Sequence, residues 1–193
     1  MLITVEGVDG AGKSTLVAEL AKALEPVTVL REPGGVGVSE RIRSLLADPS
    51  LHVDPSAEAL LYAAARAQLV NERLRPLLDA GETVLLDRFI DSSLAYQGGG
   101  RGLGIDEIRA LNQFGTGGLQ PDRTLLLRID PDVGLARISD RPADRLEQED
   151  GAFFAAIART YDELAAAEPD RFAVIDASQP PERVLADALA ALQ

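Results

Sequence analysis

The chain has 193 residues, a formal net charge of −12, no cysteine and a single histidine, His52. These numbers exclude disulfides, thiolate metal centres, histidine metal clusters and a histidine-dependent catalytic triad. The negative charge opposes binding to duplex DNA or to an anionic membrane, so we expect any anionic ligand to be small and bound by local cations. The length predicts one domain, residues 1–193.

The sequence shows no sign of membrane insertion or secretion. No apolar run approaches the ~18 residues that a membrane-spanning helix needs. The first six residues form a strand-like stretch at once, without the charged and apolar regions of a secretion signal. We therefore predict a cytoplasmic protein that binds neither nucleic acid nor membrane.

Strand-like and helix-like segments alternate along the chain. Short apolar segments rich in branched residues predict buried strands at 2–6, 27–32, 83–88, 123–130 and 172–176. Helical periodicity lies between them, at 13–24, 38–47, 56–79, 105–115, 131–139, 147–167 and 181–192. This alternation predicts a three-layer α/β fold: a five-stranded parallel sheet with helices on both faces. Ligands bind at the carboxyl ends of the strands in such sheets.

Local signals add detail to this pattern. "DP" at 130–131 and "SQPPE" at 178–182 are typical helix starts. Glycine clusters at 34–37 and 98–104 predict loops, and the polar stretch "DSSLAYQGGGRG" (91–102) predicts a flexible binding segment. The proline of "RP" at 75–76 is expected to bend or end the helix that contains it.

The stretch "GVDGAGKS" (7–14) matches G-x-x-x-x-G-K-[ST] and lies between a predicted strand and a predicted helix. Glycines let the backbone wrap around phosphates, and the helix amino end adds partial positive charge. The alternative, a glycine-rich turn with a solvated lysine, does not explain why pattern and context agree. The fold is therefore predicted to be that of a P-loop NTPase. The expected ATP contacts are Gly7, Val8, Asp9, Gly10, Ala11, Gly12, Lys13, Ser14 and Thr15, with Lys13 on the β- and γ-phosphates and Ser14 on Mg²⁺.

A phosphate loop alone is compatible with kinases, switch GTPases and motor ATPases. The N/T-K-x-D motif that reads guanine is missing, because neither Lys13 nor Lys22 has the required neighbours. A second phosphate-binding element is predicted at the end of the strand 83–88, where Asp87 and Arg88 would lie beside the loop. Asp87 could hold Mg²⁺ through water and Arg88 could bind another phosphate. The alternative is a simple ion pair at the end of a strand.

Five segments occur in the order seen in bacterial thymidylate kinases, and the resemblance covers nearly the whole chain. They are "EGVDGAGKST" (6–15), "REPGG" (31–35), "LLYAAARAQ" (60–68), "DRFIDSSLAYQGGGRGLG" (87–104) and "DRLEQED" (144–150). The block at 87–104 is the most specific of them. The resemblance implies a Mg²⁺-dependent homodimer that transfers the γ-phosphoryl of ATP to dTMP, giving dTDP and ADP for dTTP biosynthesis.

The helix 56–79 supplies two candidates for binding thymine. Tyr62 and Arg66 are four residues apart and share one helix face. The resemblance implies that Tyr62 stacks on thymine and that Arg66 donates to the ring carbonyl that cytosine replaces with an amine. The family usually has phenylalanine at position 62. The spacing alone is also compatible with a core aromatic residue beside a surface arginine.

The resemblance implies further contacts with dTMP. It places Arg43 and Arg88 on the phosphate with Glu32 nearby, and it places Asp9 near the sugar 3′-hydroxyl and the phosphate. Without the resemblance, Arg43 would be interpreted as a solvated helix residue. The remaining expected contacts are Ser92 and Gln97 on thymine and Tyr96 under the sugar.

A lid is expected at about 137–150, where arginines lie among carboxylates. Without the resemblance this stretch would be interpreted as a salt-bridged surface. Bacterial members with glycine at the position of Gly10 resemble this chain in placing arginines in the lid. Arg141 and Arg145 are therefore candidates to neutralise transition-state charge, and Arg137 and the turn 177–180 are candidates for contacting adenine.

Two rival functions stay open at this point. One is a kinase for another nucleoside monophosphate, or one of broad specificity. The other is a nucleotide-dependent binding module with a degenerate active site, against which Lys13, Ser14, Asp87 and Arg88 argue. The acceptor in a monophosphate kinase is a phosphate oxygen that is already anionic, so the chemistry needs alignment and charge neutralisation rather than a general base.

Overall fold

The computed structural model describes residues 1–140 and 142–193. Five parallel strands form one sheet in the order β2-β3-β1-β4-β5, which confirms the predicted parallel α/β architecture. The strands are β1 (Leu2–Gly7), β2 (Thr28–Arg31), β3 (Val84–Asp87), β4 (Arg123–Arg128) and β5 (Phe172–Asp176). The central strand β1 is buried along its whole length, as expected for an apolar strand covered on both faces.

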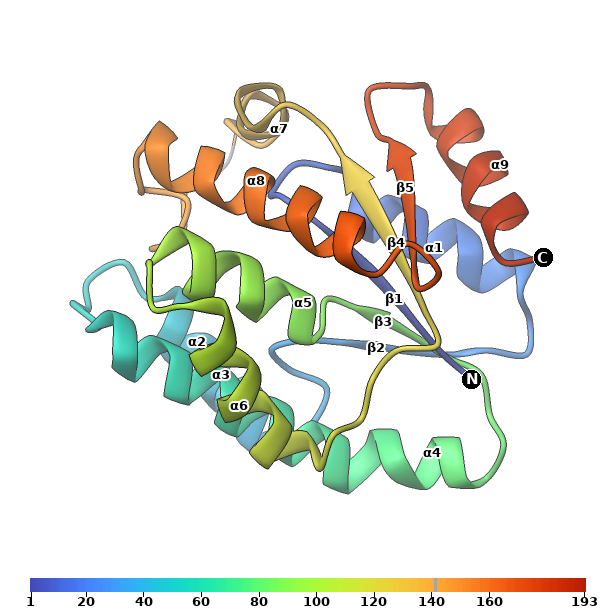
Figure 1. Cartoon of the computed structure of the whole chain (residues 1–193), viewed down its shortest axis with the longest axis horizontal. Coiled ribbons are helices and arrows are strands. Elements are labelled where there is room, and N and C mark those ends of the chain that lie inside the picture. Colours follow the sequence, from blue (N-terminus) through green and yellow to red (C-terminus); the bar gives the residue numbers. More distant parts are fainter. Residues whose placement is uncertain (141) are drawn as a thin grey trace.

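Helices cover both faces of the sheet. Figure 1 shows α1 and α9 on one side of the strands and α5 and α8 on the other. The helical elements are α1 (Lys13–Ala23), α2 (Gly37–Ala47), α3 (Pro55–Leu69), η1 (Val70–Leu74), α4 (Arg75–Asp79), α5 (Ile90–Ser93), η2 (Leu94–Gly100), α6 (Ile105–Thr116), α7 (Pro131–Arg137), α8 (Gly151–Ala167) and α9 (Pro181–Ala191). Within the described residues, none of these helices is both long and apolar enough to cross a bilayer.

The predicted helix starts at the two proline signals are confirmed. α7 begins at Pro131, and the side chain of Asp130 caps it by accepting a hydrogen bond from the backbone N–H of Asp132 at 2.9 Å. α9 begins at Pro181. The helix expected at 147–167 starts later, because the carboxylate of Asp150 accepts from the backbone of Phe153 at 2.9 Å and caps α8 there.

The prediction of a flexible loop at 91–102 is wrong. Residues 90–100 form a buried helix, α5 followed by the π-helical η2, which packs against α8. A Cβ at Gly99 would lie 2.0 Å from Thr160 Oγ1, and one at Gly100 would lie 2.7 Å from the ring of Phe153. These glycines therefore serve the close approach of two helices rather than a turn.

The proline at position 76 does not end its helix. The backbone continues from α3 through η1 into α4, where Pro76 occupies the first turn. The π-helical turn at Val70–Leu74 comes directly before it. Proline lacks an N–H, so a wider turn at this point accommodates the missing hydrogen bond without breaking the helix.

Candidate active site

A cleft of about 890 Å³ opens at the carboxyl ends of the central strands. Six cationic side chains line it: Lys13, Arg31, Arg43, Arg66, Arg88 and Arg137. Six acidic side chains also line it: Asp9, Glu19, Glu32, Asp87, Asp144 and Glu147. Among the described lining residues the charges thus balance formally, so the cleft is less hostile to an anion than the net charge of −12 suggests.

The glycine-rich loop joins β1 to α1 and forms one wall of the cleft. Gly10 and Gly12 have φ angles of 75° and 91°, which side chains other than glycine rarely adopt. The ammonium group of Lys13 donates to the carbonyls of Gly7 at 3.0 Å and Val8 at 2.8 Å. Burial, and then the like charge of Arg88, lower the pKa of Lys13 to about 8. Lys13 is therefore still a cation at neutral pH.

Gly10 packs directly against the first turn of α7. A Cβ at this position would lie 1.8 Å from the carbonyl oxygen of Gly134. The loop cannot carry a basic side chain here while α7 keeps its place. Any cation that neutralises a phosphate from this direction must therefore come from another segment.

Ser14 and Asp87 bring oxygen ligands together at the mouth of the loop. The hydroxyl of Ser14 donates to Asp87 Oδ2 at 3.3 Å. The other carboxylate oxygen, Asp87 Oδ1, is buried, and no group within residues 1–140 and 142–193 is hydrogen-bonded to it. Hydroxyl and carboxylate oxygens are ligands that Mg²⁺ accepts, so this pair fits a magnesium ion bound together with phosphates.

Arg88 lies between the two halves of the cleft. Its backbone is left-handed, with φ 65°, and the next N–H, that of Phe89, donates to Glu6 Oε1 at 2.7 Å. The guanidinium donates to the Gly7 carbonyl at 3.1 Å and to the carboxylate of Asp9. Burial raises the pKa of Asp9, but Arg88 and Lys13 outweigh it and hold the pKa below its ordinary value. Asp9 is therefore an anion that keeps Arg88 in the cleft.

Arg66 is almost completely buried at the far wall of the cleft. It donates to Glu32 Oε2 at 2.6 Å, to Ser93 Oγ and the Phe89 carbonyl at 2.9 Å each, and to Asn112 Oδ1. A guanidinium has five N–H groups, so among the described residues one is left for a ligand. Burial raises the pKa of Glu32 to about 7 although Arg66 opposes the shift.

Three predicted contacts from the segment 88–97 line the same cleft, with their polar groups already engaged. Tyr96 donates its hydroxyl to Asp9 Oδ2 at 2.8 Å. Ser92 donates to Glu6 Oε2 at 2.5 Å, below the cleft floor. Gln97 donates to Glu58 Oε1 at 2.9 Å, which fixes its amide and leaves its carbonyl oxygen available. Tyr62 also lines the cleft.

The remaining arginines lie at the rim. Arg43 donates to the Pro33 carbonyl at 2.9 Å and Arg137 to the Ala177 carbonyl at 3.1 Å, and both line the cleft. Arg145 does not line it. Its guanidinium is held by Glu58 Oε2 at 2.7 Å and by the Leu46 carbonyl at 3.0 Å. Arg141 lies outside the described residues.

Comparison with known proteins decides the family. The thymidylate kinase family model matches residues 5–188. The chain belongs to the thymidylate kinase family. Thymidylate kinases from Lactobacillus delbrueckii subsp. bulgaricus and Deinococcus radiodurans are 49% and 48% identical, covering 95% and 100% of this chain and 91% and 96% of their own. The crystal structure of thymidylate kinase from Ehrlichia chaffeensis matches with a TM-score of 0.84 at 29% identity, covering 100% of this chain and 98% of that one.

Membership makes the chain an ATP-dependent nucleoside monophosphate kinase, as the resemblance implied. The thymidylate kinase cleft gathers nearly every predicted site residue that the structure describes. Gly7 and Val8 contribute through their carbonyls, behind Lys13, and do not line the cleft. Arg145 is the other exception.

Several residues that organise this thymidylate kinase site were not predicted from the sequence. Glu6 accepts from Phe89, Ser92 and Tyr161 beneath the cleft. Glu58 accepts from Gln97 and pairs with Arg145. One signal was available for Glu6, a charged residue at the end of an otherwise apolar strand. For Glu58 the available signal was its position four residues before Tyr62, which itself lies four residues before Arg66, so that all three share one helix face.

Proposed function

We propose that the chain transfers the γ-phosphoryl of ATP to dTMP in this cleft, giving ADP and dTDP. The observation that carries the proposal is the continuity of one cleft from Lys13, through Arg88, to Tyr62 and Arg66. A donor triphosphate on the glycine loop and an acceptor base against Tyr62 would then place two phosphate groups side by side at Arg88. This arrangement is what in-line phosphoryl transfer requires.

On the donor side, the loop amides and Lys13 would bind the β- and γ-phosphates of ATP. Ser14 and Asp87 would hold Mg²⁺, whose chemistry is to neutralise and orient the phosphate oxygens. The buried, unpartnered oxygen of Asp87 supports this assignment. Arg137 and the turn 177–180 would contact adenine, since Ala177 and Gln179 line the cleft beside Arg137.

On the acceptor side, thymine would stack on Tyr62. The remaining N–H of Arg66 would donate to a ring carbonyl, and the carbonyl oxygen of Gln97 would be free to accept. Arg43 and Arg88 would bind the dTMP phosphate, and Tyr96 would lie under the sugar near Asp9. The hydroxyl of Ser92 faces Glu6, so we assign Ser92 to orienting Arg88, to which it is hydrogen-bonded at 3.1 Å.

The transfer itself needs no general base. A dTMP phosphate oxygen forms a bond to the γ-phosphorus while the bond from that phosphorus to the bridging oxygen of ADP breaks. Negative charge develops on the transferred group, and Lys13 and Arg88 would neutralise part of it from fixed positions. Arg145, and Arg141 with it, would add charge from the lid and exclude water.

We also propose that the enzyme is a cytoplasmic homodimer that binds neither nucleic acid nor membrane. The support is apolar surface on neighbouring helices: residue Leu60 on α3 is 58% exposed and residue Phe114 on α6 is 92% exposed. Sedimentation of the purified chain should give twice the monomer mass. A monomer at micromolar concentration would contradict the dimer.

The main test is ADP release with dTMP, dUMP, dCMP, AMP and GMP as acceptors. The proposal expects the highest kcat/KM with dTMP and a much lower value with dCMP, because the cytosine amine cannot accept from Arg66. Similar rates with all five would support the rival, a broad-specificity kinase. ATP binding without ADP release on any of them would support a binding module instead.

A further inference from the structure

Glu58 lies in α3, one turn before Tyr62, and its carboxylate is completely buried. Four hydrogen bonds and ion pairs converge on it. Oε1 accepts from Gln97 at 2.9 Å and from Arg101 Nε at 3.3 Å. Oε2 accepts from Arg101 Nη2 at 3.0 Å and pairs with Arg145 Nη1 at 2.7 Å. One carboxylate thus joins α3, the end of η2 and the segment 142–150 that leads into α8.

The partners of Glu58 extend the connection along this segment. Arg101 also pairs with Glu149 at 2.7 Å, and its guanidinium lies 4.8 Å from the ring centre of Phe153 at the start of α8. Arg145 uses its Nε on the Leu46 carbonyl of α2. The segment is therefore attached through Arg145 and Glu149, and each of these residues pairs with Glu58 or with its partner Arg101.

Arg145 keeps one end of its guanidinium open. Its Nη2 atom is buried and has no hydrogen-bond partner among the described residues, although Nε and Nη1 are both engaged. Two residues next to it in the chain, Asp144 and Leu146, line the cleft. Glu58 therefore holds Arg145 through Nη1, in a buried position at the border of the cleft. The Nη2 atom stays available to donate to a ligand.

We propose that Glu58 is a positioning residue for phosphoryl transfer, which fastens Arg145 and the segment 145–149 to the helix that carries Tyr62 and Arg66. The proposal rests on the function proposed above, because it acts through Arg145. Burial removes Glu58 and its arginines from competing water, so the pairing fixes the segment more firmly than an exposed ion pair would. The same carboxylate orients Gln97, so it connects the acceptor side of the cleft with the lid.

Kinetics of Glu58→Gln, Arg145→Ala and the double variant test this proposal. Each single change should lower kcat about 10- to 100-fold, because Arg145 is then either absent or no longer fixed at the border of the cleft, from where the lid would bring it to the transferred group. The double variant should be no slower than the slower single variant, since Glu58 acts through Arg145. The KM for dTMP should change little in Glu58→Gln, because the glutamine carbonyl still accepts from Gln97. A fall in kcat of the double variant that equals the product of the two single falls would overturn the proposal. An unchanged kcat in Glu58→Gln would overturn it too.

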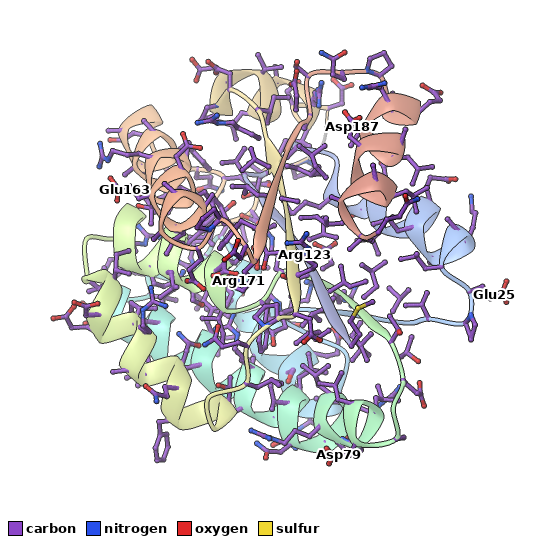
Figure 2. The ribbon with its side chains drawn as sticks, turned by 45° about the vertical axis from the view of Figure 1, so that its right-hand side comes forward. Glu25, Asp79, Arg123, Glu163, Arg171 and Asp187 are labelled. Carbon is purple, nitrogen blue, oxygen red and sulfur yellow. The ribbon has the colours of Figure 1, made fainter. Side chains whose placement is uncertain are left out.

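Glu163→Gln is the matched control. Glu163 lies on the outer side of α8, its side chain is 65% exposed, and it pairs only loosely with Arg159 at 3.9 Å (Figure 2). This variant removes the same charge and should leave kcat unchanged. A loss equal to that of Glu58→Gln would assign the effect to net charge and would overturn the positioning role.

Hydrogen exchange of the nucleotide-free protein tests whether Glu58 holds the segment 145–150 in place, and this measurement requires no enzymatic activity. Amides of residues 145–150 should exchange about tenfold faster in Glu58→Gln than in the wild type, while α1 stays unchanged. If Glu58→Gln does not fold, Arg145→Ala serves as the second variant for exchange, because it removes the same ion pair from the less buried partner. Unchanged exchange over 145–150 in the folded variant would overturn the proposal. Faster exchange in a protein that phosphorylates no dTMP would instead contradict the proposed function alone.

Discussion

Arg171 and Arg145 are both shielded from water, but they differ in how completely their hydrogen bonds are made. Arg171, beside the start of β5, donates to Asp91, Glu168 and Thr124 with all five of its N–H groups. Figure 2 shows it near the middle of the molecule, away from labelled surface residues such as Glu25 and Asp79. Arg145, beside the cleft, leaves Nη2 without a partner in the described part of the chain.

The difference extends to the other buried groups of the described chain. The buried side-chain atoms without a hydrogen-bond partner are Glu32 Oε1, Asp87 Oδ1 and Arg145 Nη2. Glu32 and Asp87 line the cleft, and Arg145 is attached to Glu58 beside it. An unsatisfied buried polar atom costs about 1–3 kcal/mol, so it is retained where a ligand can complete it. The cluster of Arg171, Asp91, Glu168 and Thr124, here called the Arg171 cluster, stabilises the fold. The cleft instead retains unpaired polar atoms that can bind substrates.

The largest effect that separates the two regions is expected at Lys13. Lys13→Met should lower kcat/KM for ATP about 10³-fold, because it removes a fixed cation that faces the transferred phosphate. The melting temperature should hardly fall. Lys22→Met is the control, since this second lysine is 72% exposed and pairs with Glu19 on the same surface helix. A loss below about tenfold in Lys13→Met, measured by ADP release, would remove Lys13 from the chemistry.

Arg171→Met should lower stability rather than activity. It should reduce the free energy of unfolding by about 3 kcal/mol. The variant leaves Asp91 buried without its partner, so the loss appears in urea denaturation. The kcat of the folded fraction should stay within about twofold of the wild type. Arg159→Met, at a side chain that is 70% exposed, should change stability by less than about 0.5 kcal/mol. A large fall in kcat of Arg171→Met without loss of stability would contradict the assignment of a structural role to Arg171 and a catalytic role to the cleft.

The smallest predicted effect is a dependence of stability on pH through Glu6. Burial, followed by the nearby charge of Asp91, raises the pKa of Glu6 from 4.5 to about 7. Between these values the folded state binds more protons than the unfolded state, so the contribution of Glu6 is fully present below pH 4.5 and is lost as the pH rises to 7.

Glu6→Gln removes this titration. Relative to the wild type, the variant should gain about 1–2 kcal/mol of stability between pH 5 and pH 8, measured by urea denaturation at both values. The comparison with wild type cancels Glu32, whose pKa is raised in both proteins. Parallel stability curves for the two proteins would show that Glu6 titrates normally.

Local patterns in the sequence predicted the fold well. Strand and helix segments alternate with clear periods, and the phosphate loop has a strict motif, so the sheet and the position of Lys13 could be inferred. The segment 91–102 was misjudged because glycines look the same in sequence whether they make a turn or let helices touch. Gly99 and Gly100 do the latter against α8.

The site was predicted only in part for a related reason. Tyr62 and Arg66 share a helix face by their spacing, which is a local property. The role of Glu58 depends on Gln97, Arg101 and Arg145, which are distant in sequence and meet only in the fold. The hydroxyl of Ser92 faces Glu6 rather than open cleft, and only tertiary structure reveals that orientation.

The central claim is that two nucleotides meet end to end in one cleft, with their phosphates between Lys13 and Arg88. A crystal structure with dTMP and a non-hydrolysable ATP analogue tests it most directly. The account predicts triphosphate on the 7–15 loop and thymine stacked on Tyr62 within hydrogen-bonding distance of Arg66. Thymine bound anywhere else, or a loop without phosphate, would contradict it.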